Sequence, residues 1–278
     1  MTSTASRSDR AELLRALAVM VEPPGPNHAD IAEALDLAPP DPADHTELFV
    51  HQLVPFASVY LGAEGKIGGD AQDRIAGYWK ALRLTPPAEP DHLAALFGLL
   101  ASLLDGVNAT EAVRKLADAA KEAFVWEHLA SWSLPYLARV GEIAAGTYRG
   151  WSRIAAQVVA YECGKGMGYA PSHFKAVPEP DPDRIETEVL VPMKSGLILT
   201  RSDLARAASA LGLALRMGER RYILDALFRQ DRPGMLLWLA DEAARQEELW
   251  STMDGPRHVR HHWRSRASRT AGALHSAY

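Results

Sequence analysis

The sequence contains one cysteine, Cys163, among its 278 residues. A single thiol excludes a disulfide within the chain and any metal site built from several cysteines, and Cys163 is expected to fill buried apolar space. No stretch approaches the ~18 consecutive apolar residues that a membrane helix needs. The early apolar run 13–21 contains Arg15 and so lacks the uninterrupted core of a signal peptide. We therefore expect a soluble, cytoplasmic protein without a membrane span.

Strand-like alternation of apolar and polar residues is also nearly absent, whereas apolar residues recur at helical spacing along almost the whole chain. This pattern predicts an all-α protein, a single bundle of about ten helices. The Thr200-Arg201-Ser202-Asp203 stretch has the spacing of a capping box and marks one helix start. The expected helices cover about 9–21, 29–37, 44–54, 70–83, 91–104, 110–130, 133–145, 149–163, 201–213, 219–229 and 234–250.

Prolines interrupt this helical pattern between residues 164 and 199. The stretch is predicted to be a long proline-rich linker or excursion, extended over 185–191, and it divides the chain. We expect a larger N-terminal helical body over 1–163 with a hinge near 85–92, a smaller C-terminal helical portion over 200–250, and a basic tail over 251–278. Composition leaves open whether the two helical parts are separate domains or one packed bundle.

The formal charge of −5 is unevenly distributed. Residues 251–278 carry five Arg and one Asp, a balance of +4, which leaves −9 for residues 1–250. An acidic body favours a cationic partner over nucleic acid. The arginines of the tail could touch phosphates, but a solvated or disordered tail is the preferred interpretation.

The Glu89-Pro90-Asp91-His92 stretch places an acid and a histidine at the mouth of the apolar segment 93–104. Pro90 disfavours helix before it, so a helix is expected to begin near Asp91. The dipole of that helix would favour the Asp91 carboxylate and keep His92 mostly neutral. A capped helix start with a local imidazole hydrogen bond is the plainer alternative.

Two further segments are rich in aromatic residues, Pro55 to Leu61 and Trp126 to Leu137. In this order and spacing, the three segments resemble those of the TorD/DmsD/NarJ group of redox-enzyme maturation chaperones. The Pro-aromatic-x-Ser-Val-aromatic-Leu segment of that group matches 55–61, its Glu-Pro-x-Asp-His motif matches 89–92 with one residue fewer before Asp91, and its His-Leu-x-x-Trp segment matches 128–132. The resemblance covers about 44–140, and more loosely the helices of 200–250.

The resemblance implies a TorD-like helical chaperone without catalysis or a cofactor of its own. Its partners would be the catalytic subunit of a molybdenum-cofactor oxidoreductase and the twin-arginine signal peptide of that subunit, with the cofactor itself involved at most indirectly. A receptor for two guanidinium groups and an apolar stretch needs carboxylates beside an aromatic groove. Asp91 is expected to contribute more than Glu89. The residues expected to bind the peptide are Pro55, Phe56, Ser58, Tyr60, Glu89, Asp91, His92, Trp126, His128 and Trp132.

Other interpretations of these residues stay open at this point. The 55–61 segment suits a core-facing turn, and Trp126 and Trp132 suit core packing equally well. A helical adaptor or assembly factor for another folded partner is the alternative function, and a hydrolase or lyase using Asp91 and His92 as an acid/base pair is a further one. Either a monomer or a helix-swapped dimer is compatible with the long linker.

Two weaker patterns are not expected to be functional. The glycines and lysine of 164–168 lack the full phosphate-loop motif, and they follow a helix where that motif follows a strand. His258, His261 and His262 have helical spacing for a metal site but are surrounded by arginines, and no carboxylate follows nearby to complete the site.

Overall fold

A computed structural model of the chain describes residues 6–62, 65–105, 111–164 and 171–278. Within these ranges every regular element is a helix, and the only β-type pairing is an isolated bridge between Phe56 and His92. The predicted all-α class is confirmed. None of the described helices combines the length and the apolar composition that crossing a membrane would require. The glycine-rich stretch discussed as a phosphate loop lies largely outside the described residues.

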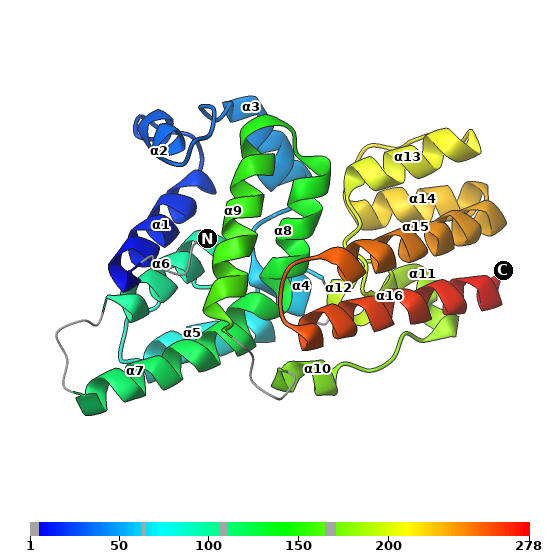
Figure 1. Cartoon of the computed structure of the whole chain (residues 1–278). Coiled ribbons are helices and arrows are strands. Elements are labelled where there is room, and N and C mark those ends of the chain that lie inside the picture. Colours follow the sequence, from blue (N-terminus) through cyan, green and yellow to red (C-terminus); the bar gives the residue numbers. More distant parts are fainter. Residues whose placement is uncertain (1–5, 63–64, 106–110, 165–170) are drawn as a thin grey trace.

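The N-terminal helices pack around α6, which is the most apolar of them. Helix α1 lies against α6 and α9, and α8 packs against α9 (Figure 1). The bounds are α1 Arg7–Met20, α2 His28–Ala34, α3 Pro42–His45, the π-helical η1 Thr46–Gln52, α4 Ala57–Leu61, α5 Asp70–Ala81, α6 Leu93–Leu104, α7 Glu111–Phe124, the π-helical η2 Val125–Ala130, α8 Ser131–Ile143 and α9 Gly146–Glu162.

The last four long helices gather at the opposite end of the molecule (Figure 1). They are α13 Arg201–Leu211, α14 Arg220–Gln230, α15 Arg232–Thr252 and α16 Arg257–Ala277. The capping box predicted at Thr200 is present, because Thr200 and Asp203 exchange hydrogen bonds between side chain and backbone. One continuous apolar core joins these helices to those of the N-terminal body.

The proline-rich excursion is not a bare linker. Short helices replace the expected extended run, because Pro171, Pro182 and Pro192 stand where a helix begins, whereas Pro178 and Pro180 lie between helices. The correction applies directly to 185–191, where a helix covers the first four residues. The elements are α10 Ser172–Ala176, the 3-10 helix η3 Pro182–Arg184, α11 Ile185–Glu188 and α12 Pro192–Ser195.

The basic tail is an ordered helix, so the prediction of a solvated or disordered tail is wrong. Helix α16 lies along α15 and buries Val259, Trp263, Ala267 and Leu274, a set with the spacing of one helix face. Its arginines hold the excursion, because the Arg266 guanidinium donates to the carbonyls of Val177 and Pro178 at 2.7 and 2.6 Å.

Gly196 fixes where the excursion meets this tail helix. It ends α12 in the left-handed conformation, with φ of +71°, which glycine adopts without strain. A Cβ atom here would lie 2.4 Å from the backbone nitrogen of Ala267. The backbone of α12 therefore touches that of α16 directly, and Thr270 donates its hydroxyl to the Ser195 carbonyl at 2.8 Å.

Candidate functional site

The first two segments singled out in the sequence meet in space. The Leu93 amide donates to the Pro55 carbonyl at 2.8 Å, and the Ala57 amide donates to the Asp91 carbonyl at 3.0 Å. These two bonds flank the bridge between Phe56 and His92 and tie the start of α4 to the start of α6. The hinge segment and the 55–61 segment therefore form one junction.

Asp91 is fully buried in this junction. One carboxylate oxygen accepts from the Ser58 amide, in the first turn of α4, and the other accepts from the Gln72 side chain, both at 3.0 Å. Helix α6 begins at Leu93, two residues after the expected start near Asp91, and its N-cap is His92 and not Asp91. The carboxylate serves the N-terminal end of α4 instead, where backbone amides lack helical partners. Both oxygens are occupied, which leaves no exposed acid for the acid/base pair considered from the sequence.

His92 is the N-cap residue of α6. Its Nδ1 accepts from the Ala94 amide at 3.3 Å and lies 3.4 Å from a carboxylate oxygen of Glu22. The Phe56 ring meets the imidazole edge to face, with 4.8 Å between centroids. Burial lowers the pKa of His92, and the charges of Glu22 and Glu89 oppose this only in part. The expectation of a mostly neutral imidazole is thus confirmed.

Only a narrow part of the junction reaches solvent. The Glu22 side chain is 50% exposed, Glu89 is exposed, and Phe56 is half-buried beside His92. We call these four residues, Glu22, Phe56, Glu89 and His92, the hinge patch. It combines two accessible carboxylates with a ring face and a neutral imidazole, a combination that suits a cationic, partly apolar ligand.

The third segment joins the same junction from inside. Tyr60 stacks on Trp132 with centroids 5.3 Å apart and planes 11° apart, and Tyr136 packs edge-on against Tyr60 at 5.2 Å. The Tyr136 hydroxyl donates to the Leu53 carbonyl at 3.1 Å. These three rings are buried, as is Trp126. The sequence leaves open whether Trp126 and Trp132 bind the peptide or pack in the core. In the structure both side chains lie in the core.

The predicted site residues therefore divide into two groups. Pro55, Ser58, Tyr60, Asp91, Trp126 and Trp132 are buried, and so is His92 at 9% exposure, whereas Phe56, Glu89 and His128 reach or approach the surface. Burial means that the first group can shape a binding surface but cannot touch a ligand without rearrangement. The exposed carboxylate of Glu22 is the member of the hinge patch that the sequence motifs do not indicate, because it lies in a loop about 70 residues from its neighbour His92.

His128 lies apart from the hinge patch, in a second group of imidazoles. Its ring packs against Tyr78 with centroids 4.9 Å apart, and burial, with the charge of Arg74 nearby, lowers the pKa of His128 and of His173 to about 4. His262, one of the three tail histidines considered as metal ligands, stacks on Phe174 at 3.9 Å instead. Burial lowers its pKa to about 3.

These imidazoles predict a loss of stability in acid. The pKa of each is lower in the folded chain than the ordinary 6.5, so below pH 6.5 the unfolded chain binds more protons. The stabilisation is complete above pH 6.5 and is lost as the pH falls toward 4. Each unit of pKa shift corresponds to about 1.4 kcal/mol, so the free energy of unfolding should fall by several kcal/mol.

Urea unfolding at about pH 7.5 and at about pH 4.5 tests this expectation. The matched variant His262→Phe keeps an aromatic ring at the position that stacks on Phe174, but this ring cannot be protonated. This variant should lose less stability in acid than the parent. Equal free energies of unfolding at the two pH values would contradict the assignment.

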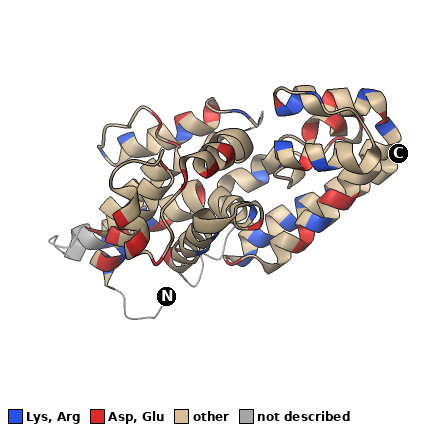
Figure 2. Cartoon of the chain, turned by 90° about the horizontal axis from the view of Figure 1, so that it is seen from above, with Lys and Arg blue, Asp and Glu red and all other residues tan. Residues whose placement is uncertain are grey.

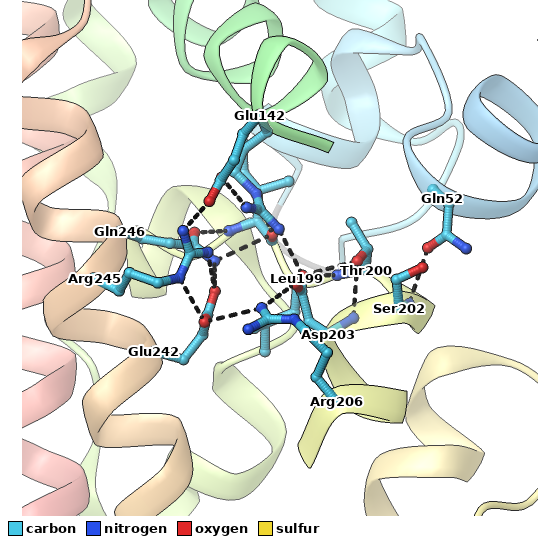
Figure 3. Close-up of polar contacts among 12 residues, drawn as sticks. Gln52, Glu142, Leu199, Thr200, Ser202, Asp203, Arg206, Glu242, Arg245 and Gln246 are labelled. Atoms are coloured by element: carbon cyan, nitrogen blue, oxygen red, sulfur yellow. Dashed lines mark hydrogen bonds and ion pairs between the residues drawn. The ribbon is translucent and has the colours of Figure 1, made fainter. Parts of the chain in front are cut away.

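A buried charged network connects the two ends of the molecule, centred on Arg139 of α8 (Figure 3). The Arg139 guanidinium donates to the Asp203 carboxylate at 2.7 Å and to the Ile198 carbonyl at 3.2 Å, and it pairs with Glu142. Asp203 also accepts from Arg206 at 2.7 Å. Helix α8 of the N-terminal body is thereby joined to α13.

Helix α15 enters the same network through Glu242 and Gln246. Glu242 accepts from Arg245 at 2.8 and 2.5 Å and from Gln246 at 2.7 Å. Gln246 accepts in turn from the Ile198 amide at 2.9 Å. Sequence reasoning identifies only the capping box in this network; a lone arginine inside the apolar segment 131–143 is the signal that could have indicated a buried partner.

Comparison with known proteins places the junction within a family match. Residues 10–136 match the family model described as nitrate reductase delta subunit. Two relatives, both named chaperone protein TorD, come from Vibrio vulnificus strains YJ016 and CMCP6. Each is 31% identical over 112 residues, which are 36% of this chain and 51% of the relative, so the chain spans about half the length of the curated relatives it matches. The resemblance predicted from the sequence is confirmed over this part of the chain, and both relatives are named as chaperones.

Proposed function

We propose, since residues 10–136 match the nitrate reductase delta subunit family model and part of this chain is similar to proteins named chaperone protein TorD, that this chain is a maturation chaperone for a molybdenum-cofactor oxidoreductase. It would hold the apo catalytic subunit, through its twin-arginine signal peptide, until the cofactor is inserted. The observation that carries the proposal is the convergence of the three family segments at one junction, which leaves the hinge patch as its exposed edge.

The hinge patch has the chemistry to bind paired guanidinium groups. Carboxylates of Glu22 and Glu89 can each accept charge-assisted hydrogen bonds from an arginine, and the Phe56 ring offers a stacking face. A neutral His92 does not repel the incoming cations, whereas an imidazolium would. We assign Asp91 a positioning role, because it holds the start of α4 against the start of α6 from inside.

To bind the apolar part of a signal peptide, the chain also needs accessible apolar side chains. Leu84, in the segment that joins α5 to α6, is 42% exposed, and Phe56 is half-buried in the hinge patch. The Phe56 ring, which meets the imidazole that faces Glu22, matches a ligand that is cationic at one end and apolar beyond it. The client is defined here by that chemistry alone.

Removal of the patch carboxylates is expected to weaken peptide binding. Glu22→Gln and Glu89→Gln should each raise the Kd for a twin-arginine signal peptide about threefold to tenfold, since a charge-assisted hydrogen bond at an exposed site contributes about 0.5–1.5 kcal/mol. Titration of the labelled peptide, native and with both arginines changed to alanine, measures this. The control Glu248→Gln makes the same charge change at an exposed position of α15 and should bind normally.

Two outcomes would count against this reading. Equal affinity for the native and the arginine-free peptide would remove arginine recognition from the proposal. A complex with the catalytic subunit that persists when its signal segment is deleted would favour the alternative, a helical assembly factor that binds the folded partner. Loss of binding in Glu22→Gln and Glu89→Gln, with Glu248→Gln unchanged, is the result that the proposal requires.

A further inference from the structure

A cavity of about 620 Å³ lies on the molecule between the π-helical η1, α4 and the starts of α13 and α14. Its volume falls within the range of about 300–1,000 Å³ that is typical of small-ligand sites. One wall is apolar and includes Val59 and Tyr60 of the family segment 55–61, so that segment borders this cavity. The apolar lining residues are Val50, Val54, Val59, Tyr60, Ile67 and Leu190.

The polar lining of the cavity is strongly cationic. Four basic side chains, Lys66, Arg201, Arg220 and Arg221, contribute to it, against the single carboxylate of Glu219. This contrasts with the chain as a whole, which is acidic up to residue 250 and which carries both signs of charge interspersed over its helices (Figure 2). A concentration of positive charge around an apolar pocket favours a negatively charged ligand.

Arg220 forms no ion pair with a described carboxylate, and the charge of Asp203 offsets its burial only in part. Its guanidinium donates one hydrogen bond, to the Leu199 carbonyl at 2.7 Å, and no described carboxylate, Glu219 included, lies within ion-pair distance. The residue is half-buried, and burial lowers its pKa. The buried Arg139 nearby is paired with two carboxylates, which is the usual requirement for a desolvated guanidinium.

Two further features favour the binding of an anion beside Arg220. Arg201 is near enough for its positive charge to oppose that of Arg220. Helix α14 begins at Arg220 with no side chain capping its first amides, so the positive end of the helix dipole is added to the same corner of the cavity. An oxyanion bound there would pair with the guanidinium groups and with these amides.

We propose that this cavity binds a small molecule that carries a phosphate group on an apolar or aromatic body. The guanidinium of Arg220 would hold the phosphate in a bidentate contact, with Arg201 as the second cation, and the apolar body would pack on the accessible side chains of Val50, Val54 and Ile67. The site is separate from the hinge patch in its residues and opposite to it in charge. The inference therefore goes beyond the proposed function and does not depend on it.

Phenyl phosphate, inorganic phosphate and pyrophosphate are suitable probes, tested by calorimetry and thermal unfolding at matched ionic strength. We expect phenyl phosphate to bind at millimolar concentration or below and more tightly than the inorganic anions, with a rise in Tm. Binding of inorganic phosphate or pyrophosphate as tight as that of phenyl phosphate would overturn the part of the proposal that concerns the apolar body. No binding of any of the three at millimolar concentration would overturn the site.

Variants separate the site from general charge effects. Arg220→Gln should weaken phenyl phosphate about tenfold or more, and Arg201→Gln, which breaks no described hydrogen bond, should weaken it several-fold. Arg229→Gln, an exposed arginine at the other end of α14, is the matched control and should bind normally. If Arg220→Gln unfolds, Arg220→Lys and Arg201→Gln carry the test. Binding unchanged in Arg201→Gln and Arg220→Lys would overturn the proposal.

The same variants distinguish this site from the proposed peptide-binding function. Arg220→Gln should leave the affinity for a twin-arginine signal peptide unchanged, and Glu89→Gln should leave phenyl phosphate binding unchanged. Displacement of phenyl phosphate by a peptide rich in Asp and Leu, at lower concentration than by pyrophosphate, would instead mark the cavity as a dock for an acidic protein segment and overturn the small-molecule assignment.

Discussion

Replacement of Asp203 by alanine is expected to lower the free energy of unfolding by about 3–5 kcal/mol, because it leaves the Arg139 guanidinium buried without its main counter-charge. The variant also removes the acceptor for the Thr200 amide and hydroxyl, at 2.7 and 2.8 Å. Guanidinium chloride unfolding at neutral pH, followed by circular dichroism, measures the loss.

Two further variants serve as comparisons for Asp203→Ala. Asp241→Ala removes an exposed carboxylate of α15 and should change the free energy of unfolding by less than about 0.5 kcal/mol. The double variant Arg139→Met with Asp203→Ala should be more stable than Asp203→Ala alone, since removal of both charges abolishes the uncompensated one. If Asp203→Ala lowered the free energy of unfolding by less than about 1 kcal/mol, the buried ion pair of Arg139 and Asp203 would not be important for stability.

The variant Trp263→Ala is expected to lower the free energy of unfolding by about 3–5 kcal/mol, the range typical of large aromatic residues removed from a core. Trp263 is fully buried in α16, its indole donates to the Ser131 carbonyl at 2.8 Å, and it packs edge to face with Trp250. Thermal and denaturant unfolding measure the effect. The exposed neighbour His261→Ala should have almost none. A disordered tail would make the two variants indistinguishable.

Helical periodicity in the sequence is enough to place the long helices, because each buries one apolar face along its whole length. The predicted 70–83 and 201–213 segments, for example, correspond to α5 and α13 with shifts of no more than two residues at either end. The four-residue helices α11 and α12 could not be found in this way, since fewer than two turns show no period.

For residues 251–278, the prediction from composition was wrong, although the apolar residues of this segment recur at helical spacing. Five arginines within 251–278 suggested a solvated segment, although Val259, Trp263, Ala267 and Leu274 stand on one helix face. Long arginine side chains are compatible with a packed helix, because their guanidinium groups reach carbonyls and carboxylates at its edge. Arg266 does so at the carbonyls of Val177 and Pro178.

For the candidate site, the sequence predicts which segments matter but not which side chains face solvent. Asp91 was assigned to the dipole of the helix that follows it, a local argument, whereas its carboxylate binds the first turn of α4, 33 residues earlier. A partner so distant in sequence leaves no local pattern. Glu22 leaves no local pattern for the same reason, since only the folded chain brings it beside His92.

The contact of α12 with α16 has a consequence for how this protein is made. During synthesis, Gly196 leaves the ribosome about 70 residues before Ala267, the residue whose backbone it touches. Residues 171–199 therefore lack their contact with α16 while the intervening helices are being translated. Until α16 has been made, this stretch lacks the helix that covers it in the folded protein, so it is open to proteases and to unintended association.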